Sequence, residues 1–148
     1  MFSLLKIKND IEVRRKMLRF INEQNRAAVT CYEDQRDESR STWSLSVLLV
    51  PLEEGEPNVS KANPAIARDI STTGIAIITP YLVEMKEAIV VLPGDEQLFA
   101  QIEFLRNRPM GLGFSVIGTR IVGFVSPKQF PILEEVDNAM KQICSNLS

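Results

Sequence analysis

The feature that most constrains the fold is a series of short apolar segments between residues 43 and 122, several of which alternate with a period of two. The clearest alternation places four apolar side chains on one face of a single segment: Leu98, Ala100, Ile102 and Phe104. Because successive side chains of a β-strand point to opposite faces, this pattern predicts half-buried strands. We predict about six such strands, over residues 43–52, 64–70, 74–80, 88–92, 98–104 and 112–122.

The connections between these segments are short and carry turn residues. Residues 93–96 give a strong turn signal, so the strands on either side of them should pair antiparallel. Residues 106–111 predict another turn, and Gly118 suggests a bulge in the last strand. Since no helical periodicity separates the strands, the sequence predicts an all-β fold, either an antiparallel sandwich or a small barrel.

A helix is expected before the strands, over residues 9–25, with Asn9 or Asp10 as its cap. One stripe of this helix is apolar: Val13, Met17, Phe20 and Ile21. The same helix carries a group of cations: Arg14, Arg15, Lys16 and Arg19. These cations form either a solvated face or auxiliary positive charge near an anionic ligand. Residues 27–32 are expected to form a short extended piece.

A second helix is expected at the end of the chain, with Pro131 in its first turn. Its apolar residues recur every three or four positions: Leu133, Val136, Met140, Ile143 and Leu147. This stripe either packs on the barrel or pairs with another helix, in a homodimer or with a partner. A chain of 148 residues fits one domain. Its expected parts are an N-terminal helical segment (1–26), a barrel (27–125) and a C-terminal helix (126–148).

Composition argues against several classes of site. Because there is no histidine, Ser-His-Asp and Cys-His nucleophile systems and histidine-ligated metals are excluded. Cys31 and Cys144 match no zinc or redox spacing. We therefore expect no catalytic residues, no metal and no cofactor. A net charge of −2 argues against nucleic acid as a partner. Since neither a signal peptide nor a membrane span is recognisable, we expect a cytoplasmic protein.

Two polar segments stand out from the strand pattern. Arg36 and Arg40 lie four residues apart in the charged segment 33–41, which we expect to be a loop. Asp69, Ser71 and Gly74 lie between two predicted strands. Asp69 and Ser71 should point away from the core, and Gly74 would supply a left-handed turn or a close approach of the backbone to a ligand. Taken alone, the two segments are typical of a charged loop and a polar turn.

Taken together, the two segments resemble those of the PilZ domain, and the resemblance implies a ligand that contains guanine and phosphate, with which the chemistry of the residues agrees. A guanidinium such as Arg36 or Arg40 can pair with phosphate or with guanine O6 and N7, and it can stack on a purine ring. The carboxylate of Asp69 can accept hydrogen bonds from guanine N1–H and N2–H, which adenine lacks. Ser71 adds a hydroxyl contact, and Gly74 keeps a Cβ away from a flat base.

The Arg-x-x-x-Arg segment before the first strand and the Asp-x-Ser-x-x-Gly segment after the second resemble, in order and setting, the PilZ domain. The resemblance covers residues 30–122. It implies a six-stranded antiparallel β-barrel that binds cyclic di-GMP, a bacterial second messenger. The ligand residues that it implies are Arg36, Arg40, Asp69, Ser71 and Gly74. The family often has smaller residues where this chain has Thr72 and Thr73.

The function predicted is that of a receptor, not an enzyme. Cyclic di-GMP would order the 33–41 loop, and the change would be relayed to an unknown downstream protein. The first alternative is a PilZ-like adaptor with weak or no nucleotide binding, whose partner surface is the C-terminal stripe. The second is an unrelated small β-barrel enzyme, although no acid–base or nucleophilic group stands out. An acidic connection at Glu53, Glu54 and Glu56 could lower affinity for an anion if it lay near the site.

Overall fold

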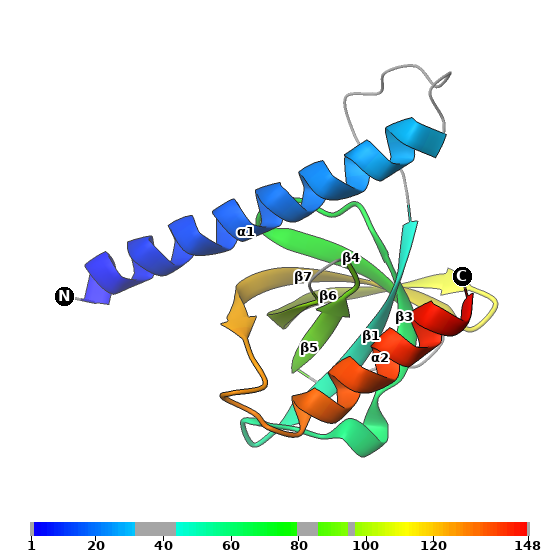
Figure 1. Cartoon of the computed structure of the whole chain (residues 1–148). Helices are drawn as coiled ribbons and strands as arrows, with labels where there is room; N and C mark the ends of the chain where they lie inside the picture. The colour runs from blue at the N-terminus through cyan, green and yellow to red at the C-terminus, as the bar shows by residue number, and fades with distance from the viewer. Residues whose placement is uncertain (1, 32–43, 80–85, 95–96, 148) are drawn as a thin grey trace.

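The computed structural model describes residues 2–31, 44–79, 86–94 and 97–147. A long helix, α1 (Phe2–Cys31), precedes the strands, and a second helix, α2 (Leu133–Leu147), follows them (Figure 1). The strands between them are β1 (Ser44–Glu53), β2 (Glu56–Pro57), β3 (Asn63–Arg68), β4 (Gly74–Thr79), β5 (Glu87–Leu92), β6 (Leu98–Gly111) and β7 (Phe114–Val125).

The strands close into a barrel. They follow the order β1-β3-β4-β7-β6-β5, every neighbouring pair is antiparallel, and β5 pairs back onto β1 with Val90 opposite Leu49. Within the ring, closure gives each strand a neighbour on both sides, which removes exposed sheet edges there. The two-residue β2 only extends the end of β1. The predicted fold, a six-stranded antiparallel barrel with a helix at each end, is confirmed.

Strand alternation fills the interior of the barrel. Ala100 and Ile102, from the face predicted to be apolar, are buried there, and Leu98 and Phe104 pack against them. Each of the other barrel strands contributes to the same cluster, through side chains that include Val47, Leu49, Ala67, Ile77, Val90 and Ile121. The core is therefore a single apolar column surrounded by the sheet.

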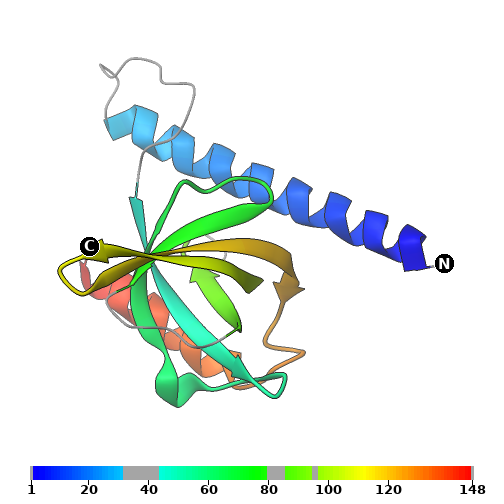
Figure 2. The same ribbon diagram turned by 180° about the vertical axis from the view of Figure 1, so that it is seen from behind.

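Helix α1 covers one end of this column. Val13, Met17 and Phe20 belong to the same buried cluster as the barrel interior, and Met17 has 0% exposed surface. Figures 1 and 2 show the helix lying across the barrel, with its N-terminal end extending past it. The predicted apolar stripe is confirmed, and it is the part of α1 that closes the core against water.

The predicted limits of this helix are wrong at both ends. It begins at Phe2, so neither Asn9 nor Asp10 is its cap, and it continues to Cys31 through the expected extended piece. Extending an existing helix adds one hydrogen bond per residue without a new nucleation cost, and alanines at 27 and 28 favour it. Asn9 has a different role: its side-chain Nδ2 donates to the carbonyl oxygen of Val122, at 2.9 Å.

The turn predicted at residues 106–111 is also wrong. β6 runs on to Gly111, and the chain turns at Leu112 and Gly113. The register of β6 with β5 ends at Glu103, beyond which the described part of β6 pairs with β7 alone. We call the hairpin formed by residues 105–118 the β6–β7 arm. Its β7 side still pairs with β4 as far as Ser115, so only the end of the arm, residues 110–114, extends beyond the barrel wall. Pro109 is tolerated in the arm because a proline can occupy an edge strand.

The irregularity expected at Gly118 originates in the opposite strand. Phe104 pairs with Thr119 and Arg106 with Gly118, so Leu105 is the extra residue. A bulge of this kind bends the strand that contains it. It lies where the arm begins.

Helix α2 packs on the outside of the barrel. Leu133 and Val136 are buried and Met140 is half-buried, against side chains that include Val50, Ile89, Val91 and Phe99. The interpretation that the stripe packs on the barrel is confirmed for these three residues. The side chains of Ile143 and Leu147 lie outside the described part of the chain. A dimer or partner contact through α2 would have to use its remaining faces.

The acidic connection lies at the far end of β1. Glu53 accepts hydrogen bonds from Lys61 (2.9 Å) and Asn58 (2.8 Å), and both hold the pKa of its carboxyl group below the usual value. The opposite end of this 10-residue strand is Ser44, about 30 Å away along an extended chain. The acidic residues are therefore remote from the segment that follows β3, whose last residue pairs with Ser44.

None of the helices in the described ranges combines the length and the apolar character that crossing a membrane requires.

Two adjacent residues of α1 test its role in closing the core. We expect Met17→Ala to lower the free energy of unfolding by about 2–5 kcal/mol, because it leaves a cavity among fully buried side chains. Leu18→Ala is the matched control, since Leu18 is 61% exposed and its truncation should cost less than about 0.5 kcal/mol. Urea denaturation measures both. Equal effects would mean that α1 does not contribute to the core.

Candidate functional site

The turn between β3 and β4 carries the Asp-x-Ser-x-x-Gly segment. Asp69 has a φ of 51°, a left-handed conformation that aspartate tolerates better than most residues. Ile70 is buried in the core, whereas Asp69 and Ser71 are exposed. The predicted arrangement, with Ile70 inward and its two neighbours outward, is confirmed.

The hydroxyl of Ser71 organises this turn. Its Oγ accepts hydrogen bonds from the backbone N–H of Thr73 (3.2 Å) and of Gly74 (3.0 Å). The N–H of Ser71 donates to the carbonyl oxygen of Gly74, at 2.9 Å. Serine side chains commonly satisfy turn backbone in this way. The polar residue at position 71 therefore has a structural explanation that needs no ligand.

Gly74 begins β4 and lies against the backbone of β7. A Cβ at this position would overlap the carbonyl oxygen of Thr119. The φ of Gly74 lies outside the left-handed range, so the left-handed turn predicted there is wrong. The close approach does exist, but the neighbour is β7 of the barrel wall.

Asp69 differs from Ser71 and Gly74 because its side chain is not needed to build the turn. The carboxylate is 61% exposed and forms an ion pair with Arg68, with 3.6 Å between Arg68 Nε and Asp69 Oδ2. Exposed pairs of this kind contribute little stability. The carboxylate can therefore exchange Arg68 for donors on a ligand at small cost.

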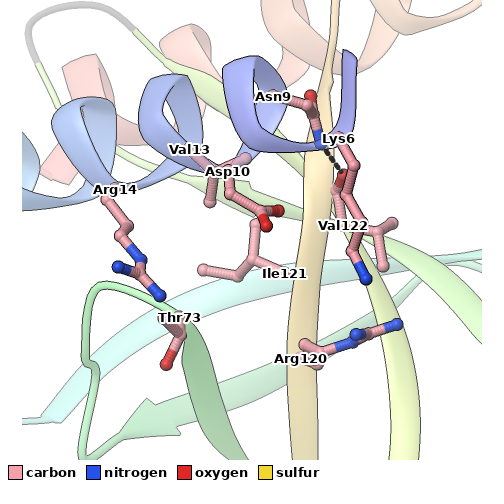
Figure 3. A pocket seen from close by; sticks show the side chains of 9 residues that line it. All are labelled: Lys6, Asn9, Asp10, Val13, Arg14, Thr73, Arg120, Ile121 and Val122. Carbon is pink, nitrogen blue, oxygen red and sulfur yellow. Dashed lines mark hydrogen bonds between the residues drawn. The ribbon is translucent and has the colours of Figure 1, made fainter. Parts of the chain in front are cut away.

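A cavity of about 350 Å³ lies beside this turn, between α1 and the barrel (Figure 3). Residues of the helix line one side: Lys6, Asn9, Asp10, Val13 and Arg14. Residues of the turn and of β7 line the other: Thr73, Arg120, Ile121 and Val122. With three cationic side chains and one carboxylate, the cavity has an excess of positive charge.

The hydrogen bond from Asn9 holds the helix over this cavity. Gln101 pairs with Gly123 and Ile102 with Ile121, so Val122 is an extra residue in β7. A bulged residue is left out of the ladder. Its carbonyl oxygen is the acceptor for Asn9 Nδ2. The bulge thus fixes the position of α1 at the edge of the cavity.

The cations of the cavity differ in their availability. Arg120 forms an ion pair with Glu103 at 2.9 Å. Arg14 extends from α1 towards Thr73 (Figure 3), and within the described ranges it takes part in no ion pair. Lys6 has no ion pair there either. Arg14 and Lys6 are therefore the side chains most able to bind an anion.

The structure divides the cationic group of α1 between two faces. Arg14 lies at the cavity. Lys16 pairs with Glu12 at 3.4 Å and Arg19 with Glu23 at 3.6 Å, both as exposed i, i+4 pairs. The interpretation as a solvated face holds for Arg19, whereas Lys16 also lies over the ring of Phe124, with its Nζ 5.1 Å from the ring centroid. Arg14 is the residue positioned near the turn.

The two arginines predicted to bind the ligand, Arg36 and Arg40, lie outside the described residues. The structure does describe where their segment rejoins the barrel: Ser44, the first residue of β1, pairs with Arg68, next to Asp69. Sequence reasoning missed Lys6, Asn9 and Arg120, which meet only because α1 crosses the barrel. The only sequence feature that pointed towards this cavity was the cationic group of the first helix, which contains Arg14.

Among the residues that the structure describes, no cluster of acidic, cysteine or histidine side chains could hold a metal ion. Comparison of the chain with family models, with curated proteins and with solved structures gave no match.

Two glycines of adjoining strands test whether the turn is built on close packing. We expect Gly74→Ala to destabilise the fold by about 1–3 kcal/mol, because its Cβ meets backbone that cannot move aside. Gly118→Ala is the control, since there the nearest atom, at 3.3 Å, is Cγ of the flexible Arg106 side chain. Thermal unfolding compares them. A Gly74→Ala variant as stable as Gly118→Ala would contradict this account.

Proposed function

We propose that this chain is a PilZ-like receptor that binds cyclic di-GMP and relays its presence to another protein. One observation carries the proposal. An exposed carboxylate that contributes little to the fold, that of Asp69, lies beside the start of β1, in the same turn as Thr73, which lines a cationic cavity under α1. One turn thus joins an acceptor for a base to a cavity that offers cations for phosphate.

Asp69 would recognise guanine. Its carboxylate can accept two parallel hydrogen bonds from N1–H and N2–H, a pairing that adenine cannot offer. The left-handed backbone at Asp69 and the hydrogen bonds of Ser71 hold the turn in one conformation. A preorganised acceptor loses little conformational entropy on binding. Ser71 and Gly74 would then act mainly by shaping the turn.

Phosphate would be bound by cations from two directions. Arg14 and Lys6 face the cavity from α1. Arg40 precedes Ser44 by four residues, so covalent geometry keeps their Cα atoms within about 14 Å of each other. A guanidinium pairs with phosphate through two hydrogen bonds, which favours arginine over lysine for this role. Arg36 would complete the contact from the other end of the motif.

The volume of the cavity limits how much of a cyclic dinucleotide it can hold. Pockets for small molecules span about 300–1,000 Å³, and a volume of about 350 Å³ is at the low end of that range. Part of a cyclic dinucleotide would enter the cavity, while the remainder would lie on the exposed turn. The segment with Arg36 and Arg40 would cover that remainder when the ligand binds. This change would be the signal that a partner reads.

The cationic contacts can be tested by calorimetric titration with cyclic di-GMP. We expect the wild-type protein to bind it, and Arg36→Ala, Arg40→Ala and Arg14→Gln each to weaken binding by about tenfold to a hundredfold, the effect of losing a charged hydrogen bond. Arg15→Gln is the matched control for Arg14→Gln, because Arg15 does not line the cavity. Equal losses of affinity in Arg14→Gln and Arg15→Gln would mean that the positive charge of α1 attracts the ligand without a specific contact from Arg14.

Base recognition has its own test at Asp69. Asparagine at this position would keep the size of the side chain and tolerate the left-handed backbone, so we expect Asp69→Asn to fold normally. It replaces one acceptor oxygen by a donor, so it should weaken cyclic di-GMP by about tenfold or more and reduce the preference over cyclic di-AMP. Competition titration measures both ligands. Unchanged discrimination would show that Asp69 does not contact the base.

The adaptor function is a second candidate. The C-terminal stripe proposed for it is partly occupied, because Leu133, Val136 and Met140 pack on the barrel. Helix α1 instead exposes Ile7, Ile11 and Leu18. If the protein is an adaptor that works through this face, calorimetric titration of the wild-type protein with cyclic di-GMP should detect no heat of binding.

A further inference from the structure

The β6–β7 arm ends in an exposed apolar tip. Figures 1 and 2 show the turn end of this hairpin projecting beyond the barrel. Leu112 is 98% exposed, Met110 49% and Phe114 40%. We call these three residues the arm tip. They occupy one turn and the strand ends beside it, so they form a small and pointed apolar surface.

Leu112 is held in a conformation that does not suit it. Its φ is 58°, between Gly111 at 96° and Gly113 at 83°. Hairpin turns with positive φ at both central residues normally use asparagine, aspartate or glycine, because other side chains clash with their own backbone there. Since Leu112 is almost fully exposed, packing within the chain does not explain it. An apolar residue at a strained and solvated position is suited to a contact outside the chain.

The arm is cationic as well as apolar. Residues 104–133 contain no aspartate or glutamate, although the whole chain has a net charge of −2. Arg106 and Arg108 lie two residues apart in β6 and therefore point to the same face. The aliphatic part of Arg106 lies over Gly118, where a Cβ would come within 3.3 Å of its Cγ. Glycine at 118 leaves room for this arginine to lie along the arm.

We propose that the β6–β7 arm docks this protein on an anionic lipid surface. The arm tip would enter the boundary between headgroups and acyl chains, about 5–10 Å deep for peripheral apolar contacts. Arg108 lies four residues from Leu112, about 13 Å along the strand, which places its guanidinium within reach of lipid phosphates. Arg106 adds a second cation on the same face. Basic residues near an anionic leaflet add favourable binding energy in this way.

The size of the arm tip favours a bilayer over a protein partner. A stable protein interface buries about 800 Å² on each side. Three side chains on one hairpin turn cannot supply that area by themselves. A bilayer accepts a few apolar side chains at a single point, and the cations behind them find phosphates without a shaped partner surface.

The docking surface is separate from the proposed ligand site. Arg120, which lines the cavity, and Phe114 at the arm tip belong to the same strand, six residues and about 20 Å apart. Both sites could therefore be occupied at once. This inference does not depend on cyclic di-GMP, and its test contains no nucleotide.

Flotation of the full-length protein with vesicles tests the proposal. One set of vesicles contains phosphatidylcholine and phosphatidylglycerol in equal parts, and the other phosphatidylcholine alone. We expect the protein to float with the first set and much less with the second, and added salt to reduce the bound fraction because it screens the arginines. Equal binding to both sets, or no binding to either, would overturn the proposal.

Variants of the arm locate the contact. Leu112→Asn should reduce the vesicle affinity by about tenfold or more, since it removes most of the inserted apolar surface. Its melting temperature should stay the same or rise, because asparagine suits the left-handed backbone. Leu112→Gly should reduce the vesicle affinity in the same way, because glycine also removes the apolar side chain and adopts a positive φ without strain. Arg106→Gln and Arg108→Gln should each weaken binding by roughly fivefold and lessen its salt dependence.

A control on α1 distinguishes the arm from the other exposed apolar surface. Ile11 is also exposed and lies on a helix with several cations. Ile11→Asn should leave vesicle binding unchanged. If Ile11→Asn abolished binding while Leu112→Asn retained it, the arm would not be the docking surface and the proposal would be wrong.

Discussion

The packing of α1 across the open end of the barrel is the interaction on which the rest of the structure depends. Val13, Met17 and Phe20 complete a core that the strands alone would leave open to water. The same packing sets the distance between the helix and the turn after β3. Lys6 and Arg14 are thereby placed at the cavity, with Arg14 above Thr73 and Lys6 beside Val122. Stability and the geometry of the candidate site therefore have a common origin.

The turn after β3 shows how a short motif can serve the fold and a ligand together. Ser71 satisfies backbone groups of the turn, and Gly74 allows β4 and β7 to approach each other. Both residues would be required even without a ligand. Asp69 is the exception, since its exposed carboxylate contributes little to the turn. The motif thus combines a rigid scaffold with one acceptor that remains free to exchange its partner.

Most strands could be predicted from the sequence because a closed barrel turns alternate residues of a strand towards its interior. Ala100 and Ile102 illustrate this, since both lie on the predicted inner face and both are fully buried. The helix limits could not be predicted in the same way. Asn9 has the chemistry of a helix cap but is used for a tertiary hydrogen bond to a bulged residue, Val122. Local chemistry does not reveal such a partner.

Neither the length of β6 nor the cavity could be predicted from the sequence, because both depend on contacts between distant parts of the chain. Pro109 and Gly111 are typical of a turn, yet an edge strand accommodates both, so the chain turned later than expected. In the candidate site, the position of Asp69 and Ser71 on one outward face followed from alternation. The cavity did not, because Lys6, Arg14, Thr73 and Arg120 are far apart in sequence and meet only through the crossing of α1 over β7.

The most direct test of the central claim is a map of amide chemical shifts on addition of cyclic di-GMP to ¹⁵N-labelled protein. The account predicts shifts grouped in the turn from Asp69 to Gly74, in α1 between Lys6 and Arg14, and around Arg120 in β7. The arm tip and α2 should stay unchanged. Shifts confined to α2 or to the arm, or no shifts at saturating ligand, would contradict it.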